Sequence, residues 1–386
     1  PRPDALIDAN AARPVAADGL TLKQDESFEA LLEGAVADVV QRQREAGLSI
    51  LGDGEFGKAM SHRVDYRAWR SYSFQRVSGL SLTDSSDLDS APPSSEKLKT
   101  GAFHERRDRQ LFPGAYSSPE SGITTGAAAT AFPVTTAAIT YTGQNAIAGD
   151  VGRLVAALRP GESGFLTAIS PGSGARILNL HYRTEADHIW AWAEALREEY
   201  KAVLDAGLHL QIDDPSIAEN WDLINPEPSL ELYRDFTELR IAALNHAIRG
   251  LPKERIRLHV CWGSWHGPHV TDIPLRDILG VLLQANVGSF SFEAANARHE
   301  HEWEVWKDAP LAEDQVLVPG VVGHATNVVE HPDLVAQRIG RFVDIVGPGR
   351  VVASTDCGLG GRVHPEIAWA KLDALGEGAR LAAQRL

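Results

Sequence analysis

Cysteine and methionine are almost absent from this sequence, whose 386 residues include two cysteines and one methionine. Two cysteines cannot form the disulfide framework of a small secreted domain. No apolar run approaches the roughly 20 residues that a membrane-spanning helix needs, and we expect no secretory leader. The sequence therefore predicts a protein of the reducing cytoplasm that does not act at a membrane.

Positive charge is also scarce, with 37 Lys and Arg against 52 Asp and Glu and a net charge of −15. Binding to nucleic acid depends on clustered Lys and Arg that neutralise phosphates, so nucleic-acid partners are not expected. Hydrophobic residues make up 44% and charged residues 23% of the chain, as in ordinary soluble proteins. We expect small-molecule partners and a core of considerable size.

Seven short apolar runs, rich in β-branched residues and bounded by turn residues, predict buried parallel strands. Patterns with helical period lie between several of them, for example at 185–207, 230–250 and 332–347. The predicted strands are 48–54, 165–170, 209–214, 255–261, 287–293, 316–322 and 350–357.

This alternation favours an α/β fold, a (β/α)8 TIM barrel, formed as a single catalytic domain over residues 1–386. The eighth strand is expected either before Pro1 or at 133–141. Residues 78–145 interrupt the alternation as a long excursion, in which 78–130 is expected to be an irregular segment or lid.

Polar residues follow most of the predicted strands at their carboxyl ends. In a TIM barrel these ends meet at one rim, where the chemistry takes place, so we expect the side chains to face one pocket. These strand-end residues are Asp53, Glu55, Ser170, Asp213, Asp214, His259, Cys261, Glu293, His324, Asp356 and Cys357.

Four of these strand-end residues have the side chains that zinc prefers. His259 and Cys261 are two apart on a strand, so both face the same side, while Glu293 and Cys357 come from other strand ends. Zinc binds thiolate, imidazole and carboxylate, and soft sulfur ligands disfavour magnesium and calcium. The alternative is that the cysteines are small buried hydrophobes, the more common role of a free cysteine.

Five motifs, in this order along the chain, resemble the catalytic domain of cobalamin-independent methionine synthase. The likeness covers nearly the whole chain and indicates the short, single-barrel branch, with a first strand missing before Pro1. The motifs are L-G-D-G-E-F (51–56), Q-I-D-D-P (211–215), H-V-C (259–261), S-F-E (291–293) and T-D-C-G-L (355–359).

The resemblance implies a zinc enzyme that alkylates a thiol, and it implies roles for individual residues. His259, Cys261, Glu293 and Cys357 match the zinc ligands, and we expect Glu293 to be the ligand that substrate displaces. Further roles fall to pocket residues. Glu55 and Asp213 match carboxylates that hold the substrate's amino group, and His324 is the nearest match to a histidine that transfers a proton. Position 214 is Asp where the long enzymes have Glu, and the residues around His324 differ from theirs, so its register is the least certain match.

Several smaller assignments follow from position alone. Asp53 and Ser170 are expected to contact substrate, Asp213 to take part in catalysis, and Trp262 either to stack on a flat substrate or to pack in the core. The segment 297–303, A-R-H-E-H-E-W, either lines the pocket, holds a second metal or begins a solvated helix, and its His299 and His301 are alternative proton donors.

Three functions remain open at this stage. The favoured one is methylation of homocysteine, since two carboxylates suit a thiol that carries an ammonium group. The second joins 2-mercaptoethanesulfonate to an epoxide, as epoxyalkane:coenzyme M transferase does, and that sulfonate needs a basic partner. The third is a lyase without zinc, like uroporphyrinogen decarboxylase. The alkyl donor is not identified by the sequence.

Overall fold

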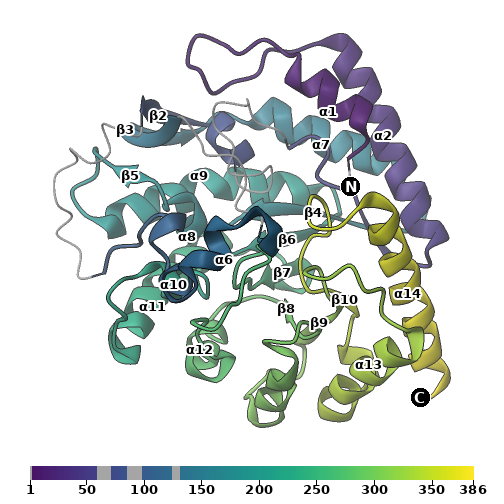
Figure 1. Cartoon of the computed structure of the whole chain (residues 1–386). Coiled ribbons are helices and arrows are strands. Elements are labelled where there is room, and N and C mark those ends of the chain that lie inside the picture. Colours follow the sequence, from purple (N-terminus) through teal and green to yellow (C-terminus); the bar gives the residue numbers. More distant parts are fainter. Residues whose placement is uncertain (1, 59–70, 85–97, 124–130) are drawn as a thin grey trace.

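The protein was analysed as a computed structural model that describes residues 2–58, 71–84, 98–123 and 131–386. Its centre is a curled sheet of seven parallel strands, in the order β1-β4-β6-β7-β8-β9-β10 (Figure 1). All seven strands that the sequence predicted are present. Their bounds are β1 Ile50–Gly52, β4 Ser163–Ile169, β6 His209–Asp213, β7 Ile256–His259, β8 Ser289–Glu293, β9 Val316–Val322 and β10 Ser354–Thr355.

Helices follow the strands and cover the outside of the curled sheet (Figure 1). Their ends are set by local sequence: Thr184 and Ser229 cap two of them by accepting hydrogen bonds from the backbone N–H groups of Asp187 and Leu232. The main outer helices are α2 Glu26–Glu45, α7 Gln144–Ala157, α9 Glu185–Asp205, α11 Leu230–Ala247, α12 Leu275–Leu282, α13 Pro332–Val346 and α14 Pro365–Gln384.

The last outer helix, α14, packs against the first long one, α2. A Cβ at Gly376 would lie 1.9 Å from the carbonyl oxygen of Ala46, so only glycine permits this approach. Arg42 of α2 also stacks on Trp369 of α14, 3.9 Å from the ring centroid. The layer of helices thus comes full circle around the seven strands, as in a TIM barrel.

The excursion contains a second, three-stranded sheet in the order β2-β3-β5, so it is not irregular throughout. Strand β3 Ala131–Tyr141 pairs antiparallel with β2 Val77–Asp84 and parallel with β5 Leu178–Asn179. The prediction that 133–141 is a barrel strand was therefore wrong. A barrel strand pairs with parallel neighbours, whereas β3 lies outside the central sheet with a run of exposed residues.

Short elements complete the described part of the excursion and the loops. Residues 85–97 and 124–130 of the expected lid lie outside the described residues. The remaining elements are α1 Asp4–Ala11, η1 Tyr72–Gln75, η2 Phe103–Glu105, α5 Arg107–Leu111, α6 Pro113–Ser117, η3 Pro119–Ser121, α8 Pro171–Gly174, α10 Asn220–Leu223, η4 Lys253–Arg255, η5 Glu300–Asp308 and η6 Pro348–Arg350.

The core lies between the sheet and its helices and is built from fully buried side chains such as Leu210, Leu258 and Phe290. Within the described residues, no helix is both long and apolar enough to cross a membrane. The parallel strands place all their carboxyl ends at one edge of the sheet, which is where the predicted site residues were expected.

Candidate metal centre and substrate pocket

The two cysteines, 96 residues apart in sequence, meet at the carboxyl ends of β7 and β10. Their Sγ atoms lie 3.9 Å apart, and both are free thiols. The ligand atoms of His259, Cys261 and Cys357 all lie within 4.8 Å of one another. Two thiolates about 2.3 Å from one tetrahedral zinc ion would be about 3.8 Å apart, so the observed spacing fits a shared metal.

Hydrogen bonds orient two of these three ligands. His259 Nδ1 lies 3.2 Å from Ser291 Oγ on the neighbouring strand, which leaves Nε2 available to a metal. The backbone N–H of Gly263 donates to Cys261 Sγ over 3.2 Å. The hydrogen bond between the thiols moves their pKa values apart, lowering that of Cys357 well below and raising that of Cys261 well above the ordinary value. The lowered pKa of Cys357 favours its thiolate, which is the form that binds metal.

Glu293, the fourth predicted ligand, lies at the end of β8 in a second group with His324 and Asp356, again within 4.8 Å. Burial raises the pKa of the Glu293 carboxyl well above its usual range. Burial also raises the pKa of Asp356 to about 7, although the backbone N–H groups of Ala294 and Ala295 donate to its Oδ1 over 2.8 and 2.9 Å. The charge of Cys357 raises the pKa of Glu293, and the charge of Glu293 raises the pKa of Cys261. The two groups of residues therefore lie next to each other.

His324 is 2% exposed, and within the described part of the chain neither of its ring nitrogens has a hydrogen-bond partner. Burial lowers its pKa to about 4, so the ring is neutral near pH 7. Asp356 Oδ2 is likewise buried and unpartnered among the described residues. Buried polar atoms are normally satisfied, so these atoms are available to a bound group.

The carboxylates expected to hold an amino group lie at the ends of β1 and β6. Glu55 Oε1 accepts a hydrogen bond from Thr167 Oγ1 and lies 3.7 Å from Lys58 Nζ. The pKa values of Asp53 and Asp213 are raised to about 6, mainly by burial, and the charge of Glu55 contributes to both shifts. This acidic pocket holds three carboxyl groups near the cation of Lys58, whose amino group donates to Thr167 Oγ1 over 2.5 Å.

The backbone at Glu55 has a φ of +58°, in the left-handed region that few residues other than glycine adopt. Gly54 before it has a φ of +68°. Arg2 holds this turn by donating to the carbonyl oxygens of Glu55 and, over 2.6 Å, Lys58. Strained backbone of this kind gathers at functional sites, and here the turn brings both Glu55 and Lys58 to Thr167.

Ser170 and Asp214 have structural contacts in the described chain. Ser170 caps α8 by accepting from the backbone N–H of Ser173 over 3.0 Å. Ser216 donates to Asp214 Oδ1, and burial raises the pKa of Asp214. The predicted contact between Ser170 and substrate stays a prediction.

Trp262 is 1% exposed, and its indole N–H donates to the carbonyl oxygen of Ile273 over 2.7 Å. Its ring lies against that of His299, with centroids 4.3 Å apart. The structure thus places a histidine beside this indole. The predicted stacking of Trp262 on a substrate stays a prediction.

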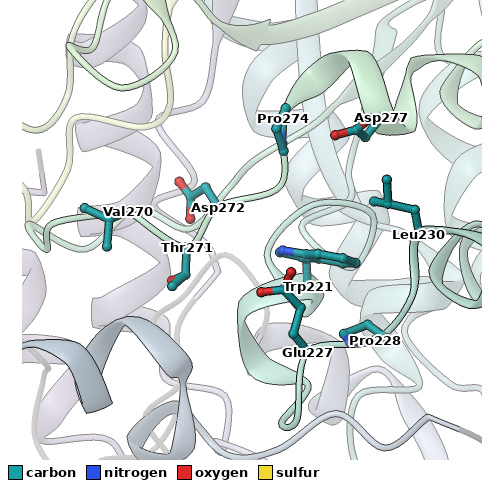
Figure 2. Close-up of a pocket in the computed structure, with 9 residues that line it drawn as sticks. All are labelled: Trp221, Glu227, Pro228, Leu230, Val270, Thr271, Asp272, Pro274 and Asp277. Atoms are coloured by element: carbon teal, nitrogen blue, oxygen red, sulfur yellow. The ribbon is translucent and has the colours of Figure 1, made fainter.

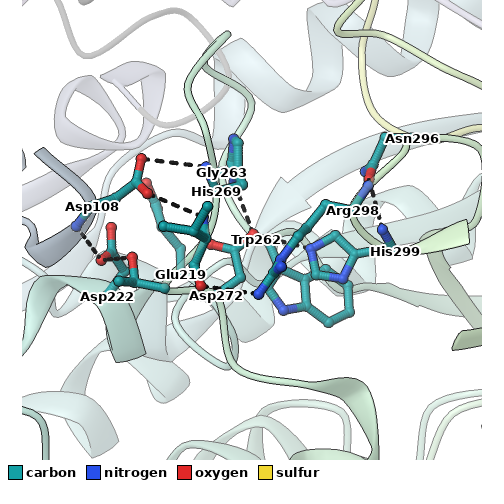
Figure 3. A network of polar contacts seen from close by, with 12 residues as sticks. Asp108, Glu219, Asp222, Trp262, Gly263, His269, Asp272, Asn296, Arg298 and His299 are labelled. Carbon is teal, nitrogen blue, oxygen red and sulfur yellow. Dashed lines mark hydrogen bonds and ion pairs between the residues drawn. The ribbon is translucent and has the colours of Figure 1, made fainter. Parts of the chain in front are cut away.

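Part of the excursion packs on the loops beside the cysteines (Figure 3). Asp108 accepts from the hydroxyl of Tyr116 over 2.8 Å and from the backbone N–H of Val270 over 3.0 Å. Arg106, fully buried, lies 3.1 Å from Glu219 and stacks on Trp265 at 3.5 Å. A lid function stays a prediction, but this segment does cover the loop that follows Cys261.

A cavity of about 350 Å³ opens beside the same loop (Figure 2). Among the described residues, no predicted ligand lines it, so we do not assign the chemistry there. It is lined by Trp221, Glu227, Pro228, Leu230, Val270, Thr271, Asp272, Pro274 and Asp277.

Residues 177–380, more than half of the chain, match the family model "Cobalamin-independent synthase, Catalytic domain". The chain belongs to this family. The matched segment contains all four predicted zinc ligands, Asp213 and His324, while Asp53 and Glu55 lie before it. The resemblance seen in the motifs is thus confirmed.

Curated relatives include the 2-hydroxypropyl-CoM lyase of Xanthobacter autotrophicus, 28% identical over 232 residues, which are 53% of this chain and 57% of the relative. A methionine synthase of Saccharolobus islandicus is 25% identical over 211 residues, 54% of each chain. The match thus spans little more than half the length of these relatives.

Among solved structures, the B12-independent methionine synthase from Shewanella sp. W3-18-1 in complex with selenomethionine superposes with a TM-score of 0.69 at 18% identity. The superposition covers 94% of this chain and 91% of that one. At this identity the likeness concerns the fold, and it supports a TIM-barrel-like arrangement.

Proposed function

We propose that this member of the cobalamin-independent synthase family is a zinc-dependent transferase that alkylates a thiol, with homocysteine as the favoured thiol and methyl as the favoured group. The observation that carries the proposal is the 3.9 Å spacing of Cys261 and Cys357 Sγ beside His259. Soft donors at this separation suit zinc and disfavour magnesium or calcium.

His259, Cys261 and Cys357 would hold the zinc, with Glu293 as the fourth ligand, which we expect the substrate thiol to displace. Bound zinc would lower the pKa of a coordinated thiol so that it is a thiolate near pH 7. An oxygen donor from a single carboxylate is the ligand that zinc gives up most readily of the four. X-ray absorption at the zinc edge tests this, and a Glu293 oxygen still bound in the thiol complex would contradict it.

The acidic pocket supports an amino-acid thiol as substrate. Asp53, Glu55 and Asp213 place three carboxyl groups near Lys58, and a bound ammonium group would help to balance their charges. Binding the amino group would also fix the direction in which the thiol points, which lowers the entropic cost of reaching the reactive geometry.

His324 is the residue proposed to move the proton. Its neutral ring and free nitrogens allow it to accept a proton, for example from the thiol, and return it to the leaving group. Asp213 would assist by holding the substrate in place. The alkyl donor stays open between a methylfolate, a methylcobalamin and an epoxide.

The similarity to 2-hydroxypropyl-CoM lyase favours one second candidate, formation of a thioether between 2-mercaptoethanesulfonate and an epoxide. A sulfonate needs a free cation in the pocket. Glu219, whose charge acts on Cys261, is paired with both Arg106 and Arg176, at 3.1 and 2.8 Å. This pairing and the acidic pocket favour an ammonium-bearing thiol over a sulfonate.

Metal analysis of the purified protein tests the zinc assignment. We expect about one zinc ion per chain, removable by a chelator with loss of thiol alkylation and restored on adding zinc. A protein that is active without any metal would reject the transferase proposal and favour a lyase of the uroporphyrinogen decarboxylase kind.

A further inference from the structure

The carboxylate of Glu293 is held by the protein at both of its oxygens. The backbone N–H of Trp262, the residue after Cys261, donates to Oε1 over 3.2 Å. The side-chain amide of Asn296 donates to Oε2. A carboxylate with one donor on each oxygen has a fixed orientation.

The two donors are themselves joined through His299. Asn296 Oδ1 accepts from the backbone N–H of His299 over 2.9 Å. The His299 ring lies against the Trp262 indole, with centroids 4.3 Å apart and planes inclined by 31°. Glu293, Trp262, His299 and Asn296 thus form a closed circuit of contacts, in which Figure 3 labels all but Glu293.

His299 is in turn clamped between two carboxylates. Its Nε2 lies 3.0 Å from Asp272 (Figure 3). Its Nδ1 lies 2.8 Å from Glu302. A ring with an acceptor on each nitrogen carries two protons and a positive charge. Glu302 also accepts from the backbone N–H of Leu275 over 2.8 Å, at the start of α12. One cation therefore ties together the loops after β7 and β8.

The contact of His299 with the two acidic side chains is buried, and its burial has a cost in free energy. His299 is 3% exposed, and Asp272 and Glu302 are 7% and 4% exposed. Burying an imidazole between two acidic side chains costs more than burying apolar side chains of the same size. Such an arrangement is found where orientation or charge is needed, as around the ligands of a metal.

We propose that His299 and Asn296 are positioning residues that fix the orientation of Glu293 toward the cysteine–histidine cluster. This inference rests on the proposed function, since it gives Glu293 the role of a metal ligand. Asn296 would orient the carboxylate directly, and His299 would act through Trp262 and through its positive charge.

The test uses the full-length protein loaded with cobalt(II), whose visible absorption reports ligand type and geometry. His299→Gln removes the charge and one of the two carboxylate contacts. Asn296→Ser removes the donor to Glu293 but keeps an oxygen for the backbone N–H of His299. His301→Gln is the matched control, because His301 lies two residues further along and is exposed.

We expect both variants to shift the cobalt absorption bands and to lower metal affinity about tenfold to a hundredfold, as changes around metal ligands do. His301→Gln should keep the cobalt spectrum and the metal affinity of the parent protein. Thermal unfolding of the metal-free proteins identifies a variant that has failed to fold. If His299→Gln does not fold, the result for Asn296→Ser decides the test, because Asn296 is only half-buried and its substitution disturbs the core less.

Parental affinity and spectrum in both folded variants would overturn the inference and leave the proposed function intact. A parental result for His299→Gln alone would overturn the part assigned to His299. If the parent protein itself binds no cobalt at the cysteines, the proposed function fails and this inference fails with it.

Discussion

The cysteine–histidine cluster and the acidic pocket lie at the same edge of one sheet but differ in how their groups are partnered. Within the described residues, the cluster at the ends of β7, β8 and β10 keeps unpartnered atoms on His324 and Asp356. In the pocket at the ends of β1 and β6, Glu55 is bonded to Thr167 and near Lys58, and Asp213 accepts from Gln211 over 2.7 Å. Within the described residues, the cysteine–histidine cluster therefore has buried polar atoms that can bind a ligand. In the acidic pocket the carboxyl groups already have partners, and what distinguishes it is its charge and its raised pKa values.

The largest expected effect comes from removing a soft ligand. Cys261→Ser or Cys357→Ser should abolish stoichiometric zinc binding and reduce thiol alkylation below detection, because an alcohol oxygen replaces a thiolate. Ser291→Ala, which removes only the partner of His259, should cost about tenfold to a hundredfold in zinc affinity. Metal analysis after dialysis against a chelator measures both. Cysteine variants that retain full zinc would show that the cluster is not the metal centre.

His324→Ala should lower turnover by about a hundredfold to ten-thousandfold, the usual contribution of a positioned acid or base. Zinc content and thiol binding should stay normal, which separates this effect from that of the cysteines. Turnover is measured with homocysteine and, in turn, a methylfolate, methylcobalamin and a short epoxide. Unchanged turnover would move the proton transfer elsewhere, with His299 and His301 as the next variants.

Glu55→Gln should weaken the binding of homocysteine by about tenfold to a hundredfold, the value of one hydrogen bond to a charged group. The matched ligand is 4-mercaptobutanoate, which lacks only the amine. Its affinity for the variant should equal that for the parent protein. If both thiols lose affinity equally, Glu55 supports the fold of the turn rather than the amine.

The smallest effect concerns pH. Burial raises the pKa of Asp53 to about 6, so its carboxyl is negative above that pH and neutral below it. The preference for homocysteine over 4-mercaptobutanoate should therefore fall roughly threefold to tenfold between about pH 7.5 and about pH 5.5. Asp53→Asn should flatten the profile only in part, because Asp213 also has a pKa of about 6. A pH-independent preference would remove both residues from amine binding.

The meeting of the two cysteines with His259 was predictable from the sequence, because all three residues lie at the ends of predicted strands. Cys261 and Cys357 end apolar runs, and parallel strands bring such ends together. The acidic half was only partly predictable. Lys58 was missed because it follows the strand by six residues and reaches Thr167 only through the left-handed turn at Gly54 and Glu55.

The fold was likewise predictable from the sequence in one part and not in another. Seven strands followed from hydrophobic runs, since buried parallel strands are apolar throughout. The segment 133–141 has the same composition, yet it pairs with β2 in a separate sheet, because strand pairing depends on contacts that composition does not encode. Asn296 was missed for a similar reason. Its role depends on the loop that turns it back toward Glu293.

The central claim is that the cysteine–histidine site converts a bound thiol into a thiolate beside an acidic pocket. Calorimetric titration of the zinc-loaded protein with homocysteine, and separately with 2-mercaptoethanesulfonate, tests it directly when buffers of different ionisation enthalpy report proton release. We predict that homocysteine binds with release of about one proton and that 2-mercaptoethanesulfonate binds weakly or not at all. Binding of the sulfonate alone would favour epoxide chemistry, and the absence of both binding and proton release would contradict the account.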